Sequence, residues 1–180
     1  MTRRPSALHV LALALSLALA ACEEAPQSRL IDMRSAGTMS FARAAAADGP
    51  FYLETIGTPF ARGVALDGAV FARHVAEAFA QPSLRFTTVK AEAPQSDYRM
   101  VWVFDPPDSL QLDALCTGQA TPGPTRRAEI LQVAAAFCHQ TRLFAVARGS
   151  VKRPVTGDEG PWRQLVQQIA RHLVTDGRPG

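Results

Sequence analysis

Three histidines are the side chains of this sequence best suited to acid–base chemistry or metal binding: His74, His139 and His172. An imidazole titrates near neutral pH, so it can act as a general base or, when neutral, as a metal ligand. Either role needs partners at a defined spacing. No Gly-x-Ser-x-Gly motif supplies a nucleophile, and the histidines lack the spacing of zinc ligands. We therefore expect a protein that is not an enzyme and has no metal site and no cofactor.

His74 falls within a predicted helix, on the same face as the apolar residues Val70, Phe71 and Ala78. One interpretation is a buried base or ligand. The other is a histidine hydrogen-bonded at the edge of the helix, which we favour because the sequence identifies no partner for it.

The segment Gly-Thr-Pro-Phe-Ala-Arg-Gly covers residues 57–63. It lacks the Lys-Ser/Thr of a P-loop and the glycine pattern of a dinucleotide site, so it does not indicate phosphate binding. It reads as a turn and loop. Aromatic and arginine side chains often anchor interfaces, which makes Phe60 and Arg62 the candidate binding surface. The alternative is that Phe60 folds back into the core.

Three cysteines are present, at positions 22, 116 and 138. No Cys-x-x-Cys motif points to redox or zinc chemistry, although a redox or metal site remains the alternative to a disulfide. We expect Cys116 and Cys138 to form a structural disulfide, worth on the order of 3 kcal/mol in the chain-entropy picture.

Cys22 ends the run Leu19-Ala20-Ala21-Cys22, after Arg3, Arg4 and an apolar stretch at residues 8–19 that is too short to span a bilayer. This arrangement resembles a bacterial lipoprotein signal. The resemblance implies that residues 1–21 are removed, that Cys22 is acylated and that it becomes the first mature residue. An ordinary secretory signal cleaved after residues 18–20 is the alternative.

Acylation of Cys22 would also resolve the odd cysteine count, and several acyl chains anchor a protein firmly. Lipoproteins retained in the inner membrane tend to have Asp after the cysteine, whereas Glu23 stands here. The resemblance therefore implies the outer membrane, with the domain facing the periplasm, a compartment that permits disulfides.

The charge balance excludes one class of partner. Lys plus Arg number 19 and Asp plus Glu 16, but removing Arg3 and Arg4 leaves 17 cations and a net charge of 17 − 16 = +1. Binding nucleic acid needs a basic stripe, so no nucleic-acid partner is expected.

The pattern after Cys22 predicts a tether at residues 22–28 and a single α+β domain at residues 29–180. Residues 29–50 give no clear pattern beyond a short strand or turn and a helical turn. Alternating or β-rich segments predict strands, and apolar residues at helical spacing predict helices that begin near Asp67 and at Pro161. We expect a two-layer sandwich in which two amphipathic helices cover one face of a mainly antiparallel sheet of about five strands. The predicted strands are residues 51–56, 84–90, 98–104, 129–138 and 143–151, and the predicted helices are 67–80 and 161–174.

This architecture resembles domains of envelope accessory lipoproteins, and residues 98–107 and 134–138 resemble segments of uncharacterised bacterial lipoproteins. Neither resemblance transfers site residues. The expected function is that of a lipid-anchored, non-catalytic envelope protein that binds another envelope protein as an accessory subunit. The alternative is a periplasmic carrier of a small hydrophobic ligand or lipid, bound between the sheet and the helices.

Overall fold

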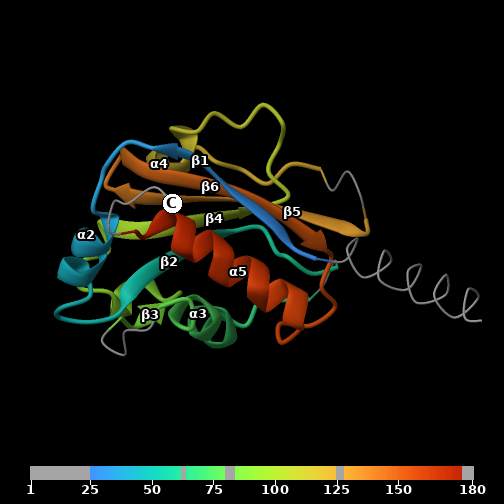
Figure 1. The fold of residues 1–180 in the computed structure, drawn as a ribbon, viewed down its shortest axis with the longest axis horizontal. Helices are drawn as coiled ribbons and strands as arrows, with labels where there is room; N and C mark the ends of the chain where they lie inside the picture. Colours follow the sequence, from blue (N-terminus) through green and yellow to red (C-terminus); the bar gives the residue numbers. More distant parts are fainter. Residues whose placement is uncertain (1–24, 62–63, 80–83, 125–127, 176–180) are drawn as a thin grey trace, which may run out of the picture.

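The computed structural model describes residues 25–61, 64–79, 84–124 and 128–175. The predicted signal at residues 1–21 and Cys22 lie outside these ranges. Within them, no helix is long and apolar enough to cross a membrane. The chain forms an α+β sandwich built on one sheet (Figure 1).

The sheet has six strands in the order β1-β6-β5-β4-β2-β3. Four strands, β1, β6, β5 and β4, pair antiparallel, whereas β2 is parallel to both β4 and β3. The prediction of about five mainly antiparallel strands is therefore corrected to a mixed sheet of six. A strand–helix–strand order joins β2 to β3, and such a crossover favours parallel pairing. The strands are β1 (Gln27–Met33), β2 (Phe51–Ile56), β3 (Phe86–Thr87), β4 (Tyr98–Phe104), β5 (Ile130–His139) and β6 (Arg142–Lys152).

Three helices cover one face of the sheet: α2 (Thr38–Ala45), α3 (Gly68–Ala76) and α5 (Gly160–Leu173). The prediction named only two, because residues 29–50 gave no clear pattern. Met100, Trp102 and Phe104 of β4 point into this core, as their alternation predicts, and Trp162 of α5 packs against Phe104. All four are at most 1% exposed.

Sequence signals place the N-terminal ends of α3 and α5 well, whereas α3 ends at Ala76, before the predicted residue 80. The Asp67 carboxylate accepts hydrogen bonds from the backbone N–H groups of Ala69 and Val70, at 2.9 and 3.1 Å, so it caps α3 as predicted. Pro161 stands in the first turn of α5.

A smaller core lies on the opposite face. Val101 and Val103 of β4 pack there against Leu115 and Cys116 of α4 (Ala114–Thr117), a single helical turn within a long loop. The sequence of this Pro- and Gly-rich segment predicts either a short helix near residues 109–115 or a loop held by the disulfide. The structure shows the disulfide and a helical turn that lies slightly later, at Ala114–Thr117.

The N-terminal boundary of the fold differs from the prediction. Residues 27 and 28, assigned to the tether, already belong to β1, which pairs with β6 at the edge of the sheet. The predicted strand at residues 84–90 shrinks to the two residues of β3, which is followed by a 3₁₀ turn at Lys90–Glu92.

Candidate functional site

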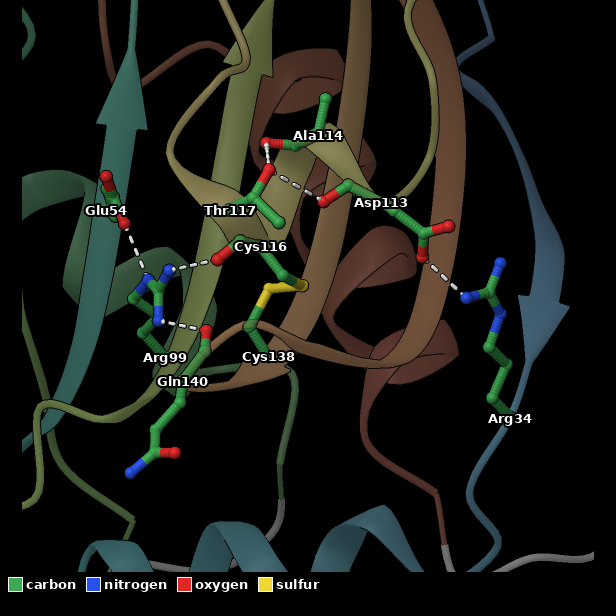
Figure 2. The surroundings of a disulfide bond; sticks show 9 residues. All are labelled: Arg34, Glu54, Arg99, Asp113, Ala114, Cys116, Thr117, Cys138 and Gln140. Atoms are coloured by element: carbon green, nitrogen blue, oxygen red, sulfur yellow. Dashed lines mark hydrogen bonds and ion pairs between the residues drawn. A yellow bond between two sulfur atoms is a disulfide. The ribbon is translucent and has the colours of Figure 1, made fainter.

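Cys116 and Cys138 form the predicted disulfide, with their Cα atoms 5.5 Å apart. It joins α4 to β5, and both cysteines are at most 1% exposed (Figure 2). A buried bond of this kind has little access to reductants, which fits a structural role.

Arg99 of β4 supports the same segment, and sequence analysis missed it. Its Nε donates to Glu54 of β2 at 2.7 Å, and its terminal nitrogens donate to the carbonyls of Gln140 and Cys116 at 2.9 and 2.8 Å (Figure 2). The Arg99 side chain is 14% exposed, so these bonds are largely shielded from water. The alternation of β4 fixed which face Arg99 points to, but its acceptors come from distant segments that no local pattern relates.

His74 is 1% exposed and lies at the edge of α3. Its Nε2 lies 2.8 Å from the Gly157 carbonyl, which can only accept, so Nε2 carries the hydrogen. Its Nδ1 has no hydrogen-bond partner among the described residues, and the nearest carboxylate oxygen of Glu77 is 3.6 Å away. The hydrogen bond expected for this histidine is therefore present.

His139 and His172 lie in other parts of the fold. The His139 ring stacks on Tyr98, with the ring centroids 4.1 Å apart. His172, in the last turn of α5, lies 3.2 Å from the Ser28 hydroxyl of β1, a pairing that sequence analysis did not anticipate. Burial, and secondarily Arg171, lowers the pKa of His172. The described residues hold no group of three metal-binding side chains.

The Ser28 hydroxyl contacts two side chains of α5. The single hydroxyl proton of Ser28 is donated to Gln168 Oε1 at 3.0 Å. The Ser28 oxygen is also hydrogen-bonded to His172 Nε2 at 3.2 Å. These bonds join β1 to α5.

The predicted binding surface at Phe60 and Arg62 does not form as expected. Phe60 is 5% exposed and packs edge-on against Trp162, with the ring centroids 6.5 Å apart. Its alternative assignment to the core therefore holds, because an apolar ring gains more by joining the aromatic cluster than by facing water. Arg62 lies outside the described residues.

A groove of about 930 Å³ lies instead between α3 and the edge strand β3. Small residues of α3 form one wall, and charged side chains, including Arg73, Glu77 and Glu92, stand around the apolar surface. Such a mostly apolar concavity with a few polar groups is typical of ligand-binding sites. The apolar residues lining it are Pro50, Ala69, Ala72, Ala76, Phe79, Leu84, Phe86 and Val89.

Comparison with known proteins identifies no family for this chain. The sequence matches no family model and no curated protein. Among solved structures, a PelC dodecamer from Paraburkholderia phytofirmans is similar at a TM-score of 0.40 and 9% sequence identity, over 80% of this chain and 94% of that one. A likeness this distant transfers no property to this chain.

Proposed function

We propose that this chain is a lipid-anchored, non-catalytic protein of the bacterial cell envelope that binds another envelope component as an accessory subunit. The observation that carries the proposal is the run Leu19-Ala20-Ala21-Cys22 placed directly before the fold. β1 begins at Gln27, so four residues separate the acylated cysteine from the sheet. The outer membrane, with the domain on its periplasmic side, is the location that we propose.

The contacts of the histidines support a binding role over catalysis. The His74 ring donates to a backbone carbonyl, the His139 ring stacks on Tyr98, and the His172 ring is hydrogen-bonded to Ser28. Each ring therefore makes at least one structural contact, which supports a non-catalytic role for these histidines.

Crosslinking in living cells followed by affinity purification tests the proposal. The wild type is compared with the Cys22→Ser variant, which keeps the domain but cannot be acylated. We expect a defined envelope protein to be crosslinked to the wild type and to be lost or strongly reduced with Cys22→Ser. Capture of no partner by either protein would contradict the accessory role.

The groove between α3 and β3 favours a second candidate, a carrier of a small hydrophobic ligand or lipid. Its volume of about 930 Å³ and its apolar lining suit part of an acyl chain. Mass spectrometry of lipids extracted from purified Cys22→Ser protein tests this, because that protein carries no acyl group of its own.

Ala69→Trp should fill the groove and remove such a ligand, because Ala69 lines it from α3. Ala65→Trp, on the exposed loop before α3, is the matched control and should retain the ligand. Equal lipid in all three proteins would exclude the groove as the carrier site.

A further inference from the structure

Two arginines lie side by side on the face of the sheet opposite α5. Arg29 of β1 is paired with Arg148 of β6 in the strand register. Gly149 faces Leu165 and Ile169 of α5, so its neighbours Arg148 and Ser150 point the other way.

The same alternation applies to β1. Ser28 bonds Gln168 and His172 of α5, so Gln27 and Arg29 point away from the helix. The two strands together therefore present both arginines, Gln27 and Ser150 to one place.

This arrangement is unfavourable without a further partner. Like charges directly opposite each other on neighbouring strands destabilise a sheet. Arg148 Nε is buried and has no hydrogen-bond partner among the described residues, and an unsatisfied charged donor is costly. Within the part of the chain that the structure describes, neither arginine forms an ion pair.

The arginines line a cavity of about 360 Å³. Gln27, Gln132 and Ser150 add polar groups to it, and Pro106 and Pro107 form a rigid wall. One carboxylate, Asp108, is also in the lining, and it has a partner of its own. The lining therefore combines two cations and one carboxylate with neutral hydrogen-bonding groups.

Guanidinium groups in pairs match the oxygens of a phosphate in charge and geometry. The cavity is larger than a bare ion requires and falls at the lower end of the range for small-molecule sites, so it has room for the organic part of a phosphate ester. The chemistry points to a phosphate group on a small headgroup.

The position of the cavity indicates the source of that phosphate, and this step rests on the proposed acylation of Cys22. Five residue steps join Cys22 to Gln27, so an extended chain spans at most roughly 18 Å. Gln27 lines the cavity, which therefore lies close to the bilayer surface in an anchored protein. We propose that Arg29 and Arg148 bind the phosphate of an anionic phospholipid in the membrane that holds the anchor.

Vesicle binding by the Cys22→Ser protein tests this proposal without help from an anchor. We expect binding to vesicles containing phosphatidylglycerol, weaker binding to pure phosphatidylcholine, and competition by inorganic phosphate. Arg29→Met and Arg148→Met should each weaken binding about tenfold or more. Arg163→Met removes the same charge from the exposed side of α5 and should leave binding almost unchanged, because the net charge of the mature chain is too small to attract a membrane by itself.

The Nε–H resonance of Arg148 in the wild type gives a direct readout that does not depend on a variant's folding. We expect it to shift when inorganic phosphate or short-chain phosphatidylglycerol is added. Arg148→Lys keeps the charge but not the two-pronged geometry, so it should recover only part of the affinity.

Three results would overturn the proposal: no vesicle binding by the Cys22→Ser protein, equal weakening by all three methionine variants, or a shift with inorganic phosphate and none with lipid. A negative result for lipid binding would not contradict the acylation of Cys22, because acylation is measured on the wild type by a different assay.

Discussion

Three helices cover one face of the sheet, whereas a loop with a single helical turn covers the other. The helix face buries large side chains such as Trp102, Trp162 and Phe71, which pack as an aromatic cluster. The loop face buries smaller residues, and α4 is four residues long, too short to be stable alone. A disulfide and the hydrogen bonds of Arg99 hold that loop in place. A large apolar core therefore stabilises one face, whereas the smaller core of the other face is supported by a covalent bond and by the hydrogen bonds of Arg99.

Leu165→Asp should have the largest effect, because it places a carboxylate in the core beneath α5, where Leu165 is 0% exposed. We expect a loss of more than about 4 kcal/mol in the free energy of unfolding, measured by urea denaturation. Gln164→Asp, one residue away on the exposed side, should change it by less than about 0.5 kcal/mol. Equal stability of the two variants would mean that α5 does not pack as described.

Replacing both Cys116 and Cys138 by alanine should cause the second largest loss of stability. The loop that the bond closes separates the cysteines by 22 positions, so we expect a loss on the order of 3 kcal/mol. The background is the Cys22→Ser protein, which should match the unacylated wild type in stability. Alkylation of Cys116 and Cys138 in that background under non-reducing, denaturing conditions would contradict the disulfide.

Arg99→Met should lower stability by about 2 kcal/mol, since it removes the ion pair with Glu54 and two bonds to backbone carbonyls. The loop face should loosen first, so thermolysin should cut between residues 107 and 124 sooner than in the wild type. Arg163→Met is the control. A double-mutant cycle sharpens the comparison: the effects of Arg99→Met and of removing the disulfide should be non-additive, because both hold the Cys116 segment. Strict additivity would contradict this shared role.

The smallest effect should be the change in stability with pH that the titration of His172 causes. This residue joins α5 to the edge strand β1. Its pKa in the fold is lowered, so the unfolded chain binds its proton more readily. Stability should therefore fall as the pH drops through about 6.5 and level off below the folded-state pKa. Between about pH 8 and about pH 5, the free energy of unfolding measured in urea should fall by more in the wild type than in His172→Gln. An identical drop in both proteins would contradict the assignment.

The helix-covered face was largely predictable, because the spacing of apolar residues along a strand or helix shows which of its sides is buried. The alternation of β4 and the apolar stripe of α5 identified which residues point inward. The sequence left β1 as a short strand or a turn, because its side chains are mostly exposed and its apolar and polar residues do not alternate. The parallel pairing of β2 was missed because it depends on the crossover through α3 rather than on either strand.

The candidate sites were less predictable than the fold. The disulfide could be predicted because only two cysteines remain once Cys22 is set aside. For Phe60 the sequence left a binding surface and the core as alternatives, because its position in a loop does not determine its burial. The arginine pair could not be predicted, since Arg29 and Arg148 are brought together only by the register of β1 on β6. Side chains that meet through strand pairing leave no local signal in the sequence.

Acylation of Cys22 is the central claim, since the envelope location and the orientation of the domain both depend on it. Cells grown with an alkyne-tagged fatty acid are tested for label on the wild type and on Cys22→Ser, and the N-terminal peptide of the mature wild type is analysed by mass spectrometry. We predict a labelled wild type whose mature chain begins at an acylated Cys22, and an unlabelled variant. An unlabelled wild type whose mature chain begins at Ala21 or at unmodified Cys22 would contradict the account and identify an ordinary secreted protein.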